Sequence, residues 1–228
     1  IVSCFVLGNI YQPVRMGEIQ NKGLALNVDI FNDKGKPIKN SKGELVCKNP
    51  FPTMPLKFWN DKRDAKFKEA YFNRFHNTWH HGDFAEIKKT KGFIIHGRSD
   101  TTLNPGGVRL GTAEIYSEVE KFKEIKESIV VGQSWDNDIR IVLFIVMNKK
   151  FILSEDLLKK IKLQIRKNAS PRHVPSKVIV VKDIPRTKSG KIVELAVKNT
   201  IEGNNIKNKE ALANPKALEQ FKNLKELN

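Results

Sequence analysis

Long hydrophobic runs are absent from this sequence. The longest one, residues 141–147, has the length of a strand and falls far short of the roughly 20 residues that cross a bilayer. Hydrophobic residues still make up 39% of the 228, which is enough to supply packed cores. We therefore predict a soluble globular protein with no membrane partner, built as one sizeable domain or two modest ones.

Cysteine is scarce, which argues against disulfides and zinc sites. The two cysteines, Cys4 and Cys47, lie in apolar, strand-like segments without CxxC spacing. We expect buried free thiols in a reducing compartment and a cytoplasmic location. The first residues, from Ile1 onward, lack the basic flank and cleavage site of a signal peptide, so we expect a fragment of a longer protein.

Acidic residues are too few to balance the basic ones, and the net charge at pH 7 is +16. Such a charge suits nucleic acid or an acidic partner, because basic side chains gain affinity by releasing counterions from phosphates. Lysine supplies most of the positive charge, however, and it is scattered among acids, whereas nucleic-acid-binding proteins favour arginine in clustered patches. We predict no nucleic-acid partner and keep a non-catalytic basic binding module as the alternative.

Short strands and turns dominate the first half of the sequence. Residues 24–30 alternate apolar and polar side chains, as in a half-buried strand, and a turn-prone stretch follows. Prolines in residues 49–55 exclude a helix or a central strand there. The other expected elements are a strand at 44–47, a short helix at about 61–72 and a hairpin that pairs 83–87 with 93–96.

Strands and amphipathic helices alternate in the second half. Thr112 is predicted to cap one helix, and Ser154 is predicted to cap a second helix that is acidic in its first turn and basic at its end. The expected strands are 128–131, 140–147 and 178–181, and a third helix is expected at 191–201. The fold class is predicted to be α/β (α+β): a β-rich first part, then a compact α+β unit around a small sheet.

Lys191 ends a basic loop with the sequence Ser-Gly-Lys. This is no P-loop, because Ile192 stands where Mg²⁺ binding needs Ser or Thr and no glycine precedes at the required spacing. A surface lysine is the simpler interpretation. The alternative is a phosphate ligand, since Gly190 permits close approach of the backbone and the start of a helix presents free N–H groups to an anion.

Two further segments carry groups suited to a nucleotide. Asp83 follows a glycine at the start of a strand, where it is either a turn-forming residue or a carboxylate that accepts hydrogen bonds from a ribose. The paired glycines Gly106 and Gly107 form either a tight turn or the wall of a narrow ligand passage. Arg98 and Arg109 flank that pair with charges that suit phosphate.

Three histidines, His76, His80 and His81, suggest a metal site at first sight. Turn-prone residues separate the first two, and no carboxylate or cysteine triad lies close to them in the sequence. We therefore predict no metal site in this chain. Asp100 lies a little further on, where the mostly β half gives way to the α+β half, which is where a hinge would be placed.

Three motifs in order resemble the acyl-adenylate-forming superfamily of acyl-CoA synthetases, luciferases and peptide-synthetase adenylation domains. HGDFAEI, GRSDTTLNPGGVRLGTAEIY and PRTKSGK are similar to its Gly-Asp, hinge-and-glycine-loop and terminal lysine motifs. Essentially the whole chain looks like the branch that joins acetoacetate to CoA. The resemblance implies the last, mostly β part of a large AMP-binding domain at 1–98, and a mobile C-terminal domain with a polar tail at 99–228.

The resemblance also implies an acid–thiol ligase that works in two steps. Acetoacetate and ATP with Mg²⁺ would form acetoacetyl-AMP and pyrophosphate, and CoA would then displace AMP. By position in the motifs, Asp83 would bind the ribose hydroxyls and Arg98 would contact the ribose and phosphate region. Lys191 would be the catalytic cation that bridges carboxylate and phosphate oxygens during adenylation.

The same resemblance implies a change of active-site wall between the two steps. Asp100 would be the hinge about which the small domain rotates. Gly107 would line the passage of the CoA thiol arm, and Arg109 would lie on the same thioester-forming face.

Parts of the family pattern have no counterpart in this sequence. The Ser/Thr/Gly-rich phosphate loop is missing, as is most of the acyl pocket, so Mg²⁺ is expected to bind mainly outside this chain and the fragment alone is expected to be inactive. Without the pocket, acetate or propionate remains an alternative to acetoacetate. The sequence does not indicate the oligomeric state.

Overall fold

The computed structural model describes residues 3–206 and 209–227. The chain forms two compact units, Ile1–Asp100 and Thr101–Asn228, called unit 1 and unit 2 below. Their division falls just after the boundary placed at residue 98, while the assignment of the two parts to a large AMP-binding domain and a mobile domain stays a prediction. Within the described ranges, no helix is long and apolar enough to span a bilayer.

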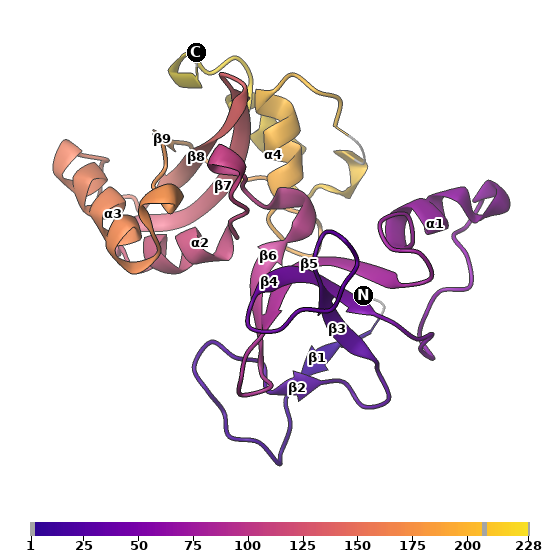
Figure 1. Ribbon diagram of the computed structural model, residues 1–228. Helices are drawn as coiled ribbons and strands as arrows, with labels where there is room; N and C mark the ends of the chain where they lie inside the picture. Colours follow the sequence, from indigo (N-terminus) through magenta and orange to yellow (C-terminus); the bar gives the residue numbers. More distant parts are fainter. Residues whose placement is uncertain (1–2, 207–208, 228) are drawn as a thin grey trace. The chain divides into compact units, whose positions relative to one another are not determined.

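Unit 1 is built on a four-stranded antiparallel sheet in which β3, β4, β5 and β6 lie in sequence order (Figure 1). Its strands are β3 (Val28–Phe31), β4 (Lys42–Cys47), β5 (Trp79–Ile87) and β6 (Phe93–Arg98), and a separate pair joins β1 (Val6–Leu7) to β2 (Asn21–Lys22). The predicted strand at 44–47 and the predicted hairpin are confirmed. The sheet packs its buried face, which includes Ile30, Leu45 and Trp79, into one apolar core.

Two predictions for unit 1 are wrong in detail. The first strand does not extend back to Leu24, which is 93% exposed, because Ala25 adopts a left-handed φ of 59° that interrupts an extended chain. Cys47 is buried as expected, but Cys4 is exposed.

A short helix follows the proline-rich loop of unit 1. The predicted helix at 61–72 is divided into a 3-10 turn, Lys62–Asp64, and α1 (Ala65–Tyr71). The carboxylate of Asp61 accepts hydrogen bonds from the backbone N–H groups of Lys66 (3.0 Å) and Phe67 (2.8 Å). These donors have no partner within the helix, so the carboxylate stabilises the first turn of α1.

Unit 2 is a three-stranded sheet covered by helices on both faces. The strands are β7 (Ile125–Trp135), β8 (Asp138–Met147) and β9 (Lys177–Val180); β7 and β8 are antiparallel, and β8 and β9 are parallel. Figure 1 shows α4 (Glu194–Ile201) on one side of this sheet, with α2 (Ala113–Val119) and α3 (Glu155–Asn168) on the other. The predicted small sheet and α+β architecture are confirmed.

Alternating side chains of β7 and β8 divide the core of unit 2 into two clusters. One cluster, which faces α4, includes Ile129, Val131, Val142 and Phe144. The other, which faces α2 and α3, includes Val130, Ile141, Leu143 and Ile145. The strands are continuous apolar runs because both faces of a covered sheet are buried.

The predicted helix caps have different outcomes. Ser154 Oγ accepts a hydrogen bond from Leu157 N (3.2 Å), so this predicted N-cap is confirmed. Thr112 precedes α2 but makes no side-chain capping bond, because its own backbone is already helical (φ −69°, ψ −30°). The last helix begins at Glu194, so the prediction that it begins at Lys191 is wrong.

The C-terminal segment folds back onto the α4 face of the sheet. It contains a 3-10 helix, Pro215–Phe221. The ring of Phe221 is fully buried and meets Phe144 edge to face, with 4.9 Å between ring centroids. The other short 3-10 turns are Ser99–Thr101, Pro105–Gly107, Pro171–His173, Lys209–Ala211 and Lys225–Leu227.

Candidate functional site

The predicted nucleotide-binding residues of unit 1 lie side by side. Asp83 on β5 is paired in register with Arg98 at the end of β6. The guanidinium group of Arg98 lies 3.4 Å from the Asp83 carboxylate and 3.5 Å from that of Asp100, and it donates a hydrogen bond to the carbonyl oxygen of His81 (3.3 Å). We call Asp83, Arg98 and Asp100 the Arg98 cluster. It presents two carboxylates and one partly exposed cation to a ligand.

Gly82 makes the close approach of Arg98 possible. It has a φ of +83°, and a Cβ atom there would lie 2.7 Å from Arg98 Nη2, so a larger side chain would displace the guanidinium group. Beside it, burial lowers the pKa of His81, an effect that Arg98 reinforces and the Asp83 carboxylate opposes. The imidazole is therefore held neutral at pH values where an exposed histidine would begin to take up a proton.

A buried carboxylate that the sequence reasoning missed fixes the chain just before Asp100. Glu44 on β4 is fully buried and lies 2.9 Å from both Arg74 Nη1 and His80 Nε2, and it accepts a hydrogen bond from the Ser99 hydroxyl. A buried carboxylate needs such partners, since the loss of its hydration is costly. One feature of the sequence could have revealed this buried site: Glu44 is a charged residue in a predicted strand that is otherwise apolar.

The paired glycines of unit 2 form a tight turn, here called the glycine turn (residues 103–110). Its two ends are joined by backbone hydrogen bonds between Leu103 and Leu110, both buried. Gly106 and Gly107 have φ values of +57° and +74°, which other residues adopt only with strain. The backbone N–H of Gly106 donates to the carboxylate of Asp138 (2.9 Å), which fastens the turn to the start of β8.

Open space surrounds the tip of the glycine turn. A Cβ atom at Gly107 would meet nothing within 4 Å, and the residue borders a hollow of about 550 Å³ whose other walls include Trp135 and Asp138. Arg109 lies on the same turn, where its Nε donates to Thr102 Oγ1 (3.1 Å). The backbone angle, not crowding, is therefore what requires glycine at 107.

Lys191 lies in a hairpin rather than at the start of a helix. In this lysine hairpin (residues 186–192), Thr187 N donates to Lys191 O (2.9 Å) and Gly190 N donates to Thr187 O (2.8 Å). Gly190, with a φ of +83°, takes the left-handed position that a three-residue hairpin loop requires. The Lys191 N–H donates to Thr187 Oγ1 (3.1 Å), so the predicted free helix N–H is absent, while the Lys191 side chain is exposed.

The lysine hairpin and the glycine turn are attached at opposite ends of β7. Arg186 of the hairpin contacts Glu127 near the beginning of the strand (2.8 Å). Gly106 contacts Asp138, which pairs with Trp135 at the strand's end. At about 3.3 Å per residue, these two points of attachment are roughly 26 Å apart along the strand. The loop with the predicted catalytic lysine and the loop with the predicted CoA-binding residues therefore belong to different regions of unit 2.

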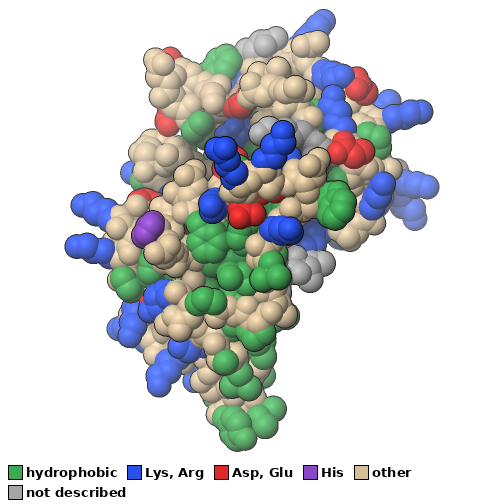
Figure 2. Space-filling view, turned by 90° about the vertical axis from the view of Figure 1, so that its right-hand side faces the viewer, with side chains coloured by type: hydrophobic (Ala, Val, Ile, Leu, Met, Phe, Trp, Pro, Cys, Tyr) green, Lys and Arg blue, Asp and Glu red, His purple; other side chains and the backbone are tan. Residues whose placement is uncertain are grey.

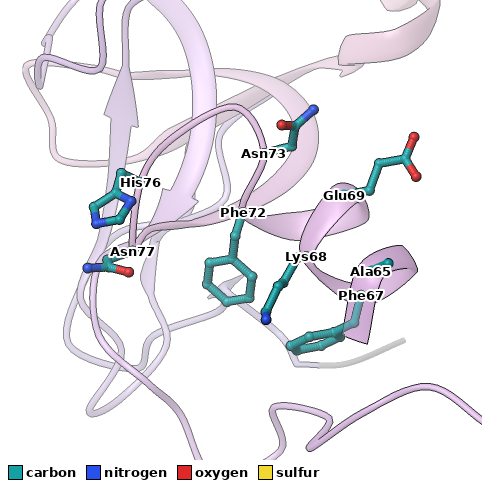
Figure 3. Close-up of a pocket in the computed structure, with 8 residues that line it drawn as sticks. All are labelled: Ala65, Phe67, Lys68, Glu69, Phe72, Asn73, His76 and Asn77. Atoms are coloured by element: carbon teal, nitrogen blue, oxygen red, sulfur yellow. The ribbon is translucent and has the colours of Figure 1, made fainter. Parts of the chain in front are cut away.

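A hollow beside α1 contains none of the predicted site residues. It has a volume of about 810 Å³, and its walls include Phe67, Lys68, Phe72 and His76. Figure 3 shows the two phenylalanine rings along it and the carboxylate of Glu69 turned away from it.

Basic side chains do not gather into one patch on the face that Figure 2 shows, where Lys and Arg are spread among acids and neutral groups. The same view shows exposed hydrophobic side chains. Unit 1 contributes most of the strongly exposed large apolar residues, among them Ile10, Tyr11, Met16, Leu56 and Trp59, each at least 88% exposed. Such a concentration is typical of a surface that another part of a protein covers.

Comparison with known families gives a match within the second unit. The family model for the AMP-binding enzyme C-terminal domain matches residues 114–191 and ends on the predicted catalytic lysine. Residues 114–191 are therefore similar to this domain. This domain holds the lysine hairpin, and the glycine turn directly precedes it, so the resemblance to the adenylate-forming family is confirmed.

Curated relatives of this chain include acetoacetyl-CoA synthetases. The protein of Rhizobium meliloti (strain 1021) is 60% identical over 100% of this chain and 35% of its own length. That of Gallus gallus is 45% identical over 100% of this chain and 34% of its own length. The chain therefore spans about a third of the length of the curated relatives it matches.

A solved structure has the same fold as this chain. The acetoacetyl-CoA synthetase of Streptomyces lividans superposes with a TM-score of 0.90 at 38% identity, covering 96% of this chain and 33% of the other. The fold of both units is therefore that of an adenylate-forming ligase.

Proposed function

We propose that this chain is part of an acetoacetate–CoA ligase. The ligase joins acetoacetate to AMP at the expense of ATP, releasing pyrophosphate, and then transfers the acyl group to the thiol of CoA, releasing AMP. The observation that carries the proposal is the similarity to acetoacetyl-CoA synthetases along the whole chain. Because the chain spans only about a third of their length, the activity belongs to a larger assembly than these residues alone.

Lys191 supplies the cation for the first step. Its ammonium group is exposed near the end of a rigid hairpin, so it is free to reach the oxygens of the substrate carboxylate and the α-phosphate. Negative charge develops on those oxygens as the carboxylate attacks, and a fixed cation stabilises that state more than the ground state. Asp83 and Arg98 hold the ribose and the phosphate region of the nucleotide.

The glycine turn serves the second step. The open space at Gly107 leaves room for the CoA thiol arm, and Arg109 lies on the same turn. The attachment of the two loops at opposite ends of β7 supports their use in different steps, since one reacting centre cannot contact both. We propose Asp100 as the hinge because unit 1 ends there.

We assign no residue of this chain as a ligand of Mg²⁺. Among the residues that the structure describes, no group of three or more His, Cys, Asp or Glu side chains could hold a metal ion. Mg²⁺ would neutralise phosphate charge on ATP, and we propose that its protein ligands lie in the part of the ligase without a counterpart here. The exposed apolar residues of unit 1 support the existence of such a part.

A cytoplasmic location belongs to the same proposal. Cys4 and Cys47 are both free thiols, and Cys4 is exposed. Thiols persist in a reducing compartment, whereas an oxidising one favours disulfides.

The test separates the two half-reactions in the ligase that contains this chain. Lys191→Ala should lower acetoacetate-dependent exchange of pyrophosphate into ATP by about 10² to 10³-fold, the range for loss of one well-placed electrostatic group. It should leave thioester formation from supplied acetoacetyl-AMP largely intact. Gly107→Leu should do the reverse, because its side chain fills the space left for the thiol arm and strains the turn at a φ of +74°. Lys188→Ala, at an exposed lysine of the same hairpin, is the control.

Three results would contradict the proposal in whole or in part. If Lys191→Ala and Gly107→Leu lose the same half-reaction, the division of roles is wrong. If acetate or propionate supports exchange better than acetoacetate does, the ligase reading holds but the substrate is a different short acid. Salt-dependent binding of nucleic acid without any ATP or CoA chemistry would replace the ligase by a basic binding module.

A further inference from the structure

The side chain of Arg186 joins the lysine hairpin to the sheet. Its Nη2 lies 2.8 Å from the carboxylate of Glu127 on β7, and its Nη1 donates a hydrogen bond to the carbonyl oxygen of Gly190 (3.2 Å). Both charged side chains are about three-quarters covered, with 28% and 25% of their surfaces exposed. The planar guanidinium fork suits two such acceptors at once, which an ammonium group cannot reproduce in the same geometry.

The bond to Gly190 fixes the peptide group next to Lys191. The carbonyl of Gly190 and the N–H of Lys191 belong to one planar peptide unit. Arg186 binds the oxygen of that unit, and Thr187 Oγ1 binds its N–H (3.1 Å). The plane from which the Lys191 side chain departs is therefore held on both sides.

Glu127 gives this arrangement a rigid base. It lies on β7, whose register with β8 is continuous from the following residue to the end of the strand. An exposed ion pair contributes little, but one fixed to a sheet at one end and to a turn at the other restricts where the turn can move. The backbone of Arg186 also pairs with Ile192 across the base of the hairpin, so the anchor acts close to the lysine.

We propose that Arg186 and Glu127 are positioning residues for the adenylation step, which hold the Lys191 hairpin in the orientation that catalysis requires. This inference rests on the proposed function of Lys191. Neither residue needs to touch the substrate: Glu127 acts through Arg186, and Arg186 acts through the peptide between Gly190 and Lys191.

The first experiment measures both half-reactions in the ligase that contains this chain. Arg186→Gln should lower pyrophosphate exchange by about 10 to 100-fold, the loss expected when a catalytic group is misplaced, with thioester formation from acetoacetyl-AMP within about twofold of the unaltered protein. Arg186→Lys, which keeps the charge for Glu127, should recover part of the loss. Lys188→Gln, a change of the same kind on the same hairpin, should have no effect.

Glu127→Gln separates positioning from direct contact with phosphate. This variant keeps the charge of Arg186 and removes only its anchor, so a role in binding phosphate would leave exchange unchanged or improve it. We expect exchange to fall, and the double variant Arg186→Gln with Glu127→Gln to be no worse than Arg186→Gln alone, because both changes break one unit. Additive losses would overturn the inference.

The second experiment does not depend on catalysis. Hydrogen exchange at the amides of Gly190 and Lys191, measured on this 228-residue chain, should become about tenfold faster in Arg186→Gln and Glu127→Gln, while the β8 amides are unchanged. Unchanged exchange at the hairpin would overturn the inference even if Lys191 is catalytic. If Lys191→Ala affects neither half-reaction, the proposed function fails instead. Hydrogen exchange alone then tests whether Arg186 and Glu127 hold the hairpin in place.

Discussion

Replacement of Tyr116 by phenylalanine should destabilise unit 2, because its hydroxyl group joins three elements. On α2, this hydroxyl donates a hydrogen bond to the carboxylate of Glu194 at the start of α4. It also accepts one from the backbone N–H of Val130 on β7 (3.0 Å). Burial and the neighbouring Glu194 carboxylate raise the pKa of the Tyr116 phenol well above its usual value, so the hydroxyl remains a donor throughout the neutral range.

The expected loss of stability depends on the hydrogen-bonding groups that phenylalanine leaves without a partner. β7 is an edge strand of its sheet, and Val130 is fully buried, so its N–H would be left without water or a replacement acceptor. An unsatisfied buried donor costs about 1 to 3 kcal/mol. Glu194 is only half-buried and can regain water, so it adds little. We expect a loss of about 2 kcal/mol, which for a unit of this size corresponds to a fall in Tm of about 6 to 10 °C.

The assay is thermal and urea unfolding of the 228-residue chain, followed by circular dichroism. Tyr71→Phe in unit 1 is the matched control, because Tyr71 stacks its ring on Trp79 with 3.7 Å between centroids, a contact that phenylalanine keeps. A loss below about 0.5 kcal/mol for Tyr116→Phe, no larger than for the control, would refute the reasoning. A Glu194→Gln variant combined with it in a double-mutant cycle should show coupling between the two side chains.

Two further predictions concern unit 1. Glu44→Gln should lower the free energy of unfolding of unit 1 by about 2 kcal/mol, because the buried carboxylate loses its charge-assisted contacts with Arg74 and His80. A urea midpoint equal to that of the unaltered chain would contradict this. His81, whose pKa is lowered in the folded state, should make unit 1 less stable as the pH falls below about 6.5, because the unfolded state then takes up the proton first. His81→Gln should flatten the pH dependence of the urea midpoint, and an unchanged slope between pH 7 and pH 5 would show that another group is responsible.

Local patterns in the sequence were sufficient for much of the fold. The β5–β6 hairpin, the strands β7 and β8 of unit 2 and the cap at Ser154 were predicted because strand periodicity and capping chemistry are local. The predictions at Leu24 and Thr112 failed because a left-handed residue and an already helical backbone decide the outcome there. Neither of these two backbone conformations can be recognised from the side chains in the sequence.

For the candidate site, the sequence predicted a set of residues but not their arrangement, and their roles stay a prediction. The order of the motifs was enough to name Lys191, but not to show that a hairpin carries it, since the bonds of Thr187 and Gly190 depend on the backbone. Glu127 could not have been found from sequence. It lies far from Arg186 along the chain, and only the packing of the hairpin against β7 brings the two together.

The length of β7 affects how the lysine hairpin and the glycine turn can change in evolution. Substitutions more than about 7 to 10 Å apart, with no shared contacts, usually act independently. The lysine hairpin and the glycine turn are fastened to this strand at points roughly 26 Å apart, and they border different core clusters. Each loop can therefore vary without compensation in the other, so one sheet allows two surfaces of the same small domain to evolve separately.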